Sequence, residues 1–158
     1  MSANKWMIFG ATGKCPHLLV KIRQRDQKIL VFDADKVLGR MHMEIACYHA
    51  FNPNQKKNLK VKNVENIIFL YVALTDQIYE AMERVGIKPE SERFAFIVLG
   101  SIDKERFLAE MGLVECEDVL AFTAEKAKNV FTKEELDATP ESQWHLLVLE
   151  RMALLGME

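Results

Sequence analysis

Phe94-Ala95-Phe96-Ile97-Val98-Leu99 is the stretch that decides the fold, because it is apolar at every position and rich in aromatic and β-branched residues. This composition favours a β-strand. A strand with one face in water alternates apolar and polar residues, and this stretch shows no such alternation. We therefore expect a strand buried on both faces, in a sheet that carries helices on two sides.

Three more segments have a similar apolar character and are predicted as strands, namely residues 6–9, 29–32 and 67–74. Capping residues and apolar periodicity predict the helices. They lie at residues 35–50, after Thr75 or Asp76 as far as Gly86, from Ser101 to Gly112, after Thr123, after Thr132, and from Thr139-Pro140 to about residue 155.

These elements predict an α/β (α+β) fold, with a central mixed or mostly antiparallel sheet of about four strands flanked by helices. The pattern leaves the polarity of the strands open. No linker or internal repeat divides the 158 residues, so residues 1–158 are expected to form a single domain.

Charge and cysteine content narrow the classes of function. The net charge of −2 argues against a uniformly basic nucleic-acid-binding protein, so any RNA contact would be a local patch. Cys15, Cys47 and Cys116 are scattered, which is typical of reduced thiols inside a cell. Neither a signal peptide nor an apolar run of roughly 20 residues is present, so we expect a cytoplasmic protein with no membrane partner.

A glycine-containing stretch, Gly10 to Lys14, follows the first strand and looks like a phosphate-binding loop. A Walker loop has four residues between its glycine and the Gly-Lys pair, whereas this one has two. A dinucleotide fingerprint fits better, since Asp33 lies 20 residues after Gly13, but Pro16 replaces its third glycine. A small nucleotide- or dinucleotide-binding enzyme is therefore the alternative interpretation of this stretch, and a simple glycine turn is favoured over it.

No other pattern points to catalysis or to a metal. His42 and His49 are two helical turns apart, about 10.5 Å, which is too far to share one ion. No nucleophile and base stand at a recognisable spacing. We expect a non-enzyme with no catalytic residues, metal or cofactor.

Two predicted helices have more apolar surface than one core contact needs. In residues 35–50, a core stripe is expected on one side, and a second side of small residues would let a backbone or ligand approach closely; the stripe is Val37, Leu38, Met41, Ile45 and Tyr48, and the second side is Gly39, Met43, Ala46 and Ala50. This helix is either sandwiched within its own domain or partly open to a ligand.

The last helix is apolar almost all round from Trp144 to Leu155, with Glu150 and Arg151 as the charges of its second half. Such a helix either threads the core or is covered in part by a partner.

A lysine-rich loop follows the first long helix, with aromatic residues on either side of it in the sequence. Its cations are Lys56, Lys57, Lys60 and Lys62, and the aromatic residues are Tyr48, Phe51, Phe69 and Tyr71. Cations beside stacking surfaces are typical of single-stranded RNA contacts, and a solvated loop is the other interpretation.

Three stretches, taken in order, resemble a known family. They are residues 32–46 (FDADKVLGRMHMEIA), residues 67–86 with QIYEA at 77–81, and LERMALL at 149–155. The chain is similar along nearly its whole length to the small kinase-binding subunit of the KEOPS complex, the PRPK-binding protein family, and it resembles the archaeal members.

The resemblance implies a non-catalytic regulatory subunit that binds and stimulates a small atypical kinase, which is an ATPase within the complex. It also implies capture of the single-stranded 3′ CCA end of tRNA, in a complex that installs threonylcarbamoyladenosine through a separate transferase subunit. The expected kinase-binding residues are Leu147, Glu150, Arg151, Leu154 and Leu155. The expected tRNA-binding residues are Gly39, Arg40, His42, Lys56, Lys57, Lys60, Lys62 and Tyr71.

One departure from the family pattern weakens the expected RNA contact. Archaeal relatives commonly carry an arginine at the position of Asp76, just before Gln77-Ile78. An aspartate there removes a possible phosphate contact and adds repulsion.

Overall fold

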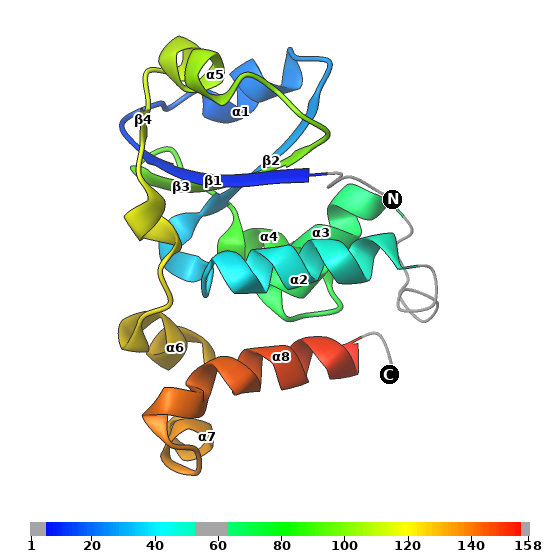
Figure 1. The fold of residues 1–158 in the computed structure, drawn as a ribbon, viewed down its shortest axis with the longest axis vertical. Helices are drawn as coiled ribbons and strands as arrows, with labels where there is room; N and C mark the ends of the chain where they lie inside the picture. The colour runs from blue at the N-terminus through cyan, green and yellow to red at the C-terminus, as the bar shows by residue number, and fades with distance from the viewer. Residues whose placement is uncertain (1–5, 53–62, 156–158) are drawn as a thin grey trace.

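A four-stranded antiparallel sheet lies at the centre of the protein, with strand order β2-β3-β1-β4. The computed structural model describes residues 6–52 and 63–155 (Figure 1). Strand β3 (Arg93–Leu99) pairs along its whole length with β1 (Trp6–Thr12) and β2 (Lys28–Asp33), and Ile97 lies opposite both Ile8 and Leu30. The short β4 (Val114–Glu115) pairs with the end of β1. The expected α+β class and the antiparallel sheet of four strands are confirmed.

Helices occupy both sides of this sheet. Figure 1 shows α1 and α5 on one side, α2, α3 and α4 on the other, and α6, α7 and α8 beyond them. The helical elements are α1 (Leu18–Arg23), the 3₁₀ turn η1 (Ala34–Lys36), α2 (Arg40–Phe51), α3 (Val64–Ala73), α4 (Ile78–Val85), α5 (Lys104–Met111), η2 (Glu117–Leu120), α6 (Ala124–Val130), α7 (Lys133–Asp137), η3 (Glu141–Gln143) and α8 (Trp144–Leu155).

Two hydrophobic cores result, one on each face of the sheet. The smaller core places Phe9, Phe96 and Phe107 together, with ring centroids 5.1 to 6.2 Å apart. The larger core joins Phe32 and Ile97 to the helices of the other side. The prediction that 94–99 is a strand buried on both faces is therefore confirmed.

The predicted strand at 67–74 is wrong, because these residues belong to helix α3. Asn63 caps the start of α3 by accepting a hydrogen bond from the Asn66 amide, and Leu74 ends it in a left-handed conformation with φ of 58°. A short apolar run fits a buried strand or a buried helix equally well. The fourth strand of the sheet is instead β4. Neither β4 nor helix α1 was predicted from the sequence.

The predicted helix at 35–50 is interrupted. Residues Ala34–Lys36 form η1, and α2 begins only at Arg40, after Gly39 with φ of 146°. That backbone conformation is rarely open to residues other than glycine, and it lets the chain turn sharply into α2.

The remaining helix predictions hold, with small shifts at the starts. Thr123 and Thr132 cap α6 and α7, and Thr132 forms a capping box with Glu135. Helix α4 begins after Gln77 and ends at Gly86, and α5 begins after Asp103 rather than Ser101. Among the described residues no helix is long and apolar enough to cross a membrane.

Gly10 gives a test of how closely the chain segments pack. A β-carbon at this position would lie 2.6 Å from the carbonyl oxygen of Cys116 and 2.5 Å from a methyl group of Val119. We predict that Gly10→Ala lowers the free energy of unfolding by about 1–3 kcal/mol, because the backbone before η2 would have to move. Urea denaturation measures the change, and Thr12→Val in the same strand is a control expected to stay within about 0.5 kcal/mol. An unchanged midpoint for Gly10→Ala would contradict the close approach.

Candidate protein-docking surface

Helix α8 is half core and half surface. Its buried side consists of Trp144, Val148 and Met152, while Leu146 and Leu154 are 47% and 48% exposed. One side of this helix therefore packs in the core, as the first alternative has it, and coverage of the exposed side by a partner stays a prediction. The predicted kinase-binding residues divide accordingly: Glu150 and Leu154 are exposed, and Leu147, Arg151 and Leu155 are partly buried.

Polar contacts fix α8 to the two helices before it. The indole nitrogen of Trp144 donates hydrogen bonds to the carbonyl oxygens of Leu136 and Thr139, at 3.2 and 2.9 Å. Arg151 forms an ion pair with Glu135 and lies 5.2 Å from the centre of the Phe131 ring. Hydrogen bonds from Thr132 and the charge of Arg151 lower the pKa of Glu135. Glu135 therefore stays ionised, which preserves the ion pair.

The side of helix α2 that faces the core is not the side predicted from the sequence. Met43, Ala46 and Ala50 are fully buried, whereas Met41 and Tyr48, which were expected in the core, are 53% and 71% exposed. The small side chains let α2 approach α3 closely, so packing distance rather than hydrophobicity decides the orientation. The small-residue side is thus buried within the domain, the helix as a whole is not sandwiched, and the expected core stripe is wrong at Met41 and Tyr48.

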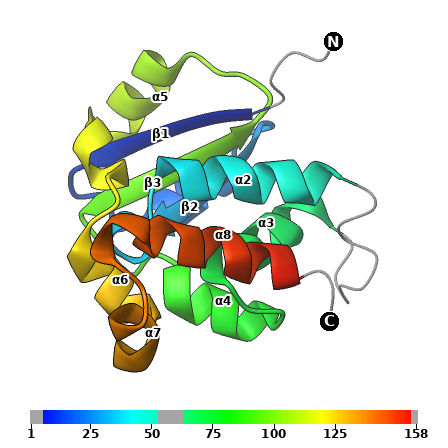
Figure 2. The same cartoon turned by 60° about the horizontal axis from the view of Figure 1, so that its bottom comes forward.

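Helices α2 and α8 lie side by side (Figure 2), and residues of both line a groove. The groove has a volume of about 240 Å³ and a mainly apolar lining. We call it the α2–α8 groove; it is lined by Leu38, Gly39, Arg40, Met41, His42, Leu120, Phe122, His145, Val148 and Leu149.

Lys126 positions the wall of the groove formed by Leu120 and Phe122. Its buried ammonium group donates to the carbonyl oxygens of Val119 and Ala121, at 2.8 and 3.1 Å. Burial lowers the pKa of this lysine. The bonds hold the extended segment between η2 and α6 against the start of α2.

The residues predicted to bind tRNA are partly brought together at the start of α2. Arg40 donates to Glu117 at 2.6 Å and to the carbonyl oxygen of Ile8 at 2.8 Å. The hydrogen bond and charge of Glu117 raise the pKa of Arg40, and Arg40 lowers that of Glu117. Gly39 is buried at the helix start. Lys56, Lys57, Lys60 and Lys62 lie outside the described residues.

His42 and Tyr71 are buried below this surface. His42 is 4% exposed, and its Nε2 lies 3.1 Å from the carbonyl oxygen of Tyr71, so Nε2 is the donor. Its Nδ1 has no hydrogen-bond partner among the described residues. The Tyr71 ring is fully buried and stacks on His49, with centroids 4.7 Å apart. In this arrangement, His42 and Tyr71 join α2 to α3.

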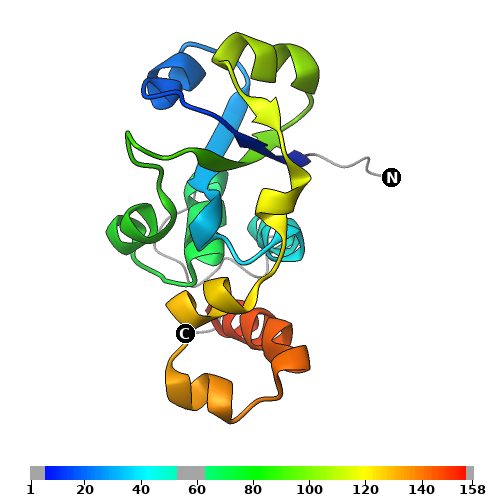
Figure 3. The ribbon, with the colours of Figure 1, turned by 90° about the vertical axis from the view of Figure 1, so that its left-hand side faces the viewer.

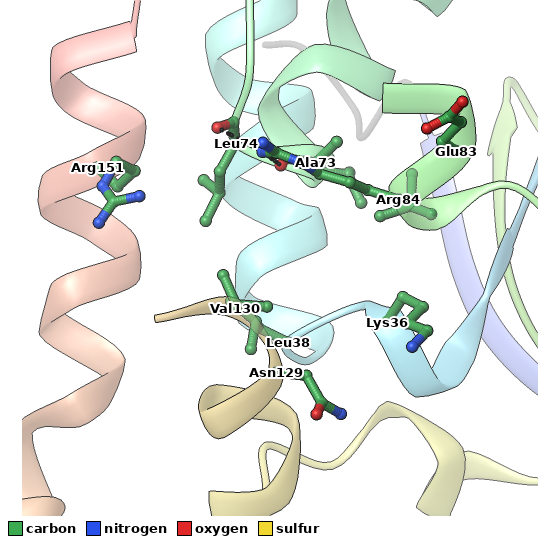
Figure 4. Close-up of a pocket in the computed structure, with 11 residues that line it drawn as sticks. Lys36, Leu38, Ala73, Leu74, Glu83, Arg84, Asn129, Val130 and Arg151 are labelled. Atoms are coloured by element: carbon green, nitrogen blue, oxygen red, sulfur yellow. Dashed lines mark hydrogen bonds between the residues drawn. The ribbon is translucent and has the colours of Figure 1, made fainter. Parts of the chain in front are cut away.

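A second cavity, of about 410 Å³, lies between the α3–α4 turn, α6 and α8 (Figure 4). Arg84 and Arg151 both line it, yet both are already engaged. Arg84 donates to the carbonyl oxygens of Ala73 and Leu74, at 3.1 and 3.3 Å, and pairs with Glu80. Arg84 therefore satisfies carbonyl groups at the end of α3, and the other polar side chains that line the cavity are Lys36, Glu83 and Asn129.

The glycine stretch at Gly10 does not form the phosphate-binding turn of the alternative function. Gly10 and Thr12 belong to β1, and α1 begins only at Leu18. Strand β3 lies between β1 and β2 and is antiparallel to both, whereas a dinucleotide-binding fold needs adjacent parallel strands. Among the described residues, no group of three His, Cys, Asp or Glu side chains is placed to hold a metal ion.

Comparison with known families identifies the chain. A family model described as kinase binding protein CGI-121 matches residues 14–155. The chain belongs to the CGI-121 family. The match runs from the end of β1 to the end of α8, so it includes both helices of the α2–α8 groove. A search of curated proteins found no match.

The burial of His42 predicts a pH-dependent stability. Burial lowers the pKa of His42 from 6.5 to about 4, so the folded protein keeps the ring neutral. The unfolded chain takes up a proton near pH 6.5, and stability is therefore complete above that pH and lost as the pH falls toward 4. We expect protonation of His42 in the unfolded chain to lower the free energy of unfolding by about 2 kcal/mol between pH 7.5 and pH 5.

Urea denaturation at the two pH values measures this loss. The matched variant is His42→Gln, whose amide can still donate to the Tyr71 carbonyl but does not titrate. The other histidines are common to both proteins, so the difference between them isolates His42. Equal pH dependence of the two proteins would show that His42 is not held neutral.

Proposed function

We propose that this CGI-121 family protein is a non-catalytic regulatory subunit of the KEOPS complex. In this role it binds and stimulates the small kinase or ATPase subunit and helps to recruit tRNA through its 3′ CCA end. The complex would then act through its transferase subunit, with which this chain is associated indirectly. Family membership supports kinase binding, and the resemblance of the sequence supports the assignment to KEOPS.

The exposed apolar face of α8 is the observation that carries the kinase-binding proposal. Leu146 and Leu154 lie about two helical turns apart, with Glu150 and Ala153 also exposed between them. Complete burial of one leucine contributes roughly 1.5–3 kcal/mol, so a partner that covers both gains substantial affinity. Residues with apolar side chains on one exposed helix face are typical of a helix that docks on a partner.

The apolar surface continues beyond α8 across the α2–α8 groove. Met41 on α2 and Phe122 beside it are 53% and 38% exposed, and both line this groove. A side chain of the kinase that enters the groove would be surrounded by apolar walls. Leu147, Arg151 and Leu155 would act in this interface chiefly by holding α8 in place, since they are partly buried.

We predict that Leu154→Glu weakens binding of the kinase subunit by about tenfold or more, because it places a charge in an apolar contact. Calorimetric titration of the purified kinase subunit measures the affinity, and co-purification gives a second readout. Tyr79→Glu is the matched control, since Tyr79 is 87% exposed on α4 and does not line the α2–α8 groove. Unchanged affinity for Leu154→Glu and Leu146→Glu would rule out this face as the kinase-binding site.

For tRNA, we place the contact at Arg40 and at the lysines that follow α2 in the sequence, Lys56, Lys57, Lys60 and Lys62. Gly39 shapes the start of α2, and His42 and Tyr71 would position the helices below the contact. Asp76 is exposed at the start of the α3–α4 turn and would repel phosphate groups. Arg40 would have to exchange Glu117 for a phosphate group, a replacement of one anion by another.

Two RNA measurements test this part. We predict that tRNA lacking its CCA end binds more weakly than intact tRNA at the same salt concentration. We also predict that Asp76→Arg strengthens binding and steepens the slope of log affinity against log salt by about 1, as one new phosphate contact would. Glu134→Arg on α7, an exposed position with the same change of net charge, serves as the charge control. Equal affinity for the two tRNAs would exclude capture of the 3′ end.

A further inference from the structure

Strand β2 is the terminal strand of the sheet, and only one of its edges is paired. Its partner is β3, and no described strand lies on its other side. An unpaired edge presents a row of backbone N–H and C=O groups, which proteins generally cover, shorten or use for binding. The edge of β2 spans six residues, from Lys28 to Asp33, which is long enough to pair with another strand.

A groove of about 320 Å³ runs along this edge. Ile29, Leu30 and Val31 all line it, and they belong to both faces of the sheet: Ile29 and Val31 pack in one core and Leu30 in the other. Successive residues of a strand share a groove only when the groove lies at the strand edge. We call it the β2-edge groove.

The two walls of the β2-edge groove come from opposite sides of the sheet (Figure 3). Leu19, Ile22 and Arg23 of α1 form one wall, and Met82, Gly86 and Ile87, at and after α4, form the other, with Phe69 of α3. Leu19 and Met82 are 41% and 39% exposed. The groove is therefore apolar inside and open to solvent at its rim.

The segment between β1 and β2, which contains α1 and thus one wall of this groove, is positively charged, and its Arg23 lines the groove. Residues 14–28 carry five cations (Lys14, Lys21, Arg23, Arg25 and Lys28) and one carboxylate, Asp26, a net charge of +4 with histidine neutral. The whole chain has a net charge of −2, so the rest of it is acidic. No ion pair within the described residues involves Lys14, Lys21 or Arg23, whereas Arg25 pairs with Glu110 at 2.8 Å and Lys28 pairs with Glu65 of α3 at 3.4 Å.

We propose that the β2-edge groove binds an extended acidic segment of a partner protein, which adds to β2 as a further strand. Backbone hydrogen bonds to β2 would hold the segment, as in other cases of strand addition. Alternate side chains of an added strand point to opposite faces of the sheet. Acidic side chains would point toward α1 and its cations, and apolar side chains toward Met82 and Ile87.

A second copy of this chain fits the same edge poorly. Antiparallel pairing of β2 with β2 of another copy would follow a two-fold axis, and it would bring the two α1 helices to the same face of the joined sheet. Lys21 and Arg23 of α1, which have no ion pair within the described residues, would then lie on the same face as their copies. Charge complementarity therefore favours an acidic partner over self-association.

This inference is independent of the proposed kinase-binding surface. No residue lines both the β2-edge groove and the α2–α8 groove. Changes at Arg23 or Lys28 are therefore expected to leave kinase binding unchanged, and Leu154→Glu is expected to leave strand addition unchanged. Failure of one proposal can thus be told apart from failure of the other.

The test uses the full chain and a fluorescent peptide of eight alternating Glu and Val residues with blocked ends. We expect saturable binding by fluorescence anisotropy, weakened by salt, and weaker binding of the same peptide with Lys in place of Glu.

Backbone methylation tests whether the peptide pairs as a strand. All N–H groups on one edge of a strand belong to residues with side chains on one face. N-methylation of all Val or of all Glu residues should therefore abolish binding in one peptide and spare it in the other.

Charge reversal in the protein supplies the matched variants. Arg23→Glu is expected to weaken peptide binding by about fivefold to tenfold, whereas Lys133→Glu on α7, with the same change of net charge, should have little effect. Hydrogen exchange should show added protection of backbone amides in β2. The proposal is overturned by absence of binding up to millimolar peptide, by equal binding of both N-methylated peptides, or by a chain dimer that occupies this edge.

Discussion

The burial of helix α3 after its first turn is the constraint on which the other parts of the structure depend. Every residue from Ile67 to Ala73 is at most 9% exposed, so this part of α3 has no side suited to water. A helix that is apolar all round must be covered all round. The sheet covers one side of α3, and α2 and α4 cover others, which fixes the positions of these two helices.

Coverage of α3 also determines which side of α2 faces solvent. The buried side of α2 combines small residues with Met43 and Cys47, and it approaches α3 closely enough for His42 to bond the Tyr71 carbonyl. The large residues Met41 and Tyr48 are consequently directed outward. The apolar surface proposed for the kinase thus results from tight packing elsewhere, since a helix cannot bury its small and its large side in the same contact.

The sequence predicted the sheet better than it predicted the helices next to it. Continuous apolar character identified β3 correctly, because a strand in a covered sheet shows no alternation. The same criterion failed for α3, where the informative signals were Asn63 as a cap and Glu65 in the first turn. In α2, hydrophobicity alone selected Met41 and Tyr48 for the core. Which side packs depends on the shape of the neighbouring helix, and a single sequence does not contain that shape.

Nearly every side of helix α8 is apolar, so apolar burial alone does not select the side that is buried. Rotation about its axis would exchange one set of leucines for another at little cost in buried apolar area. The polar residues remove this degeneracy, because the Trp144 indole needs the carbonyl oxygens of Leu136 and Thr139, and Arg151 needs Glu135. Hydrogen bonds are directional, and an unsatisfied buried donor is costly. Three polar contacts therefore set the rotation of α8 and determine that Leu146 and Leu154, rather than Val148 and Met152, remain exposed.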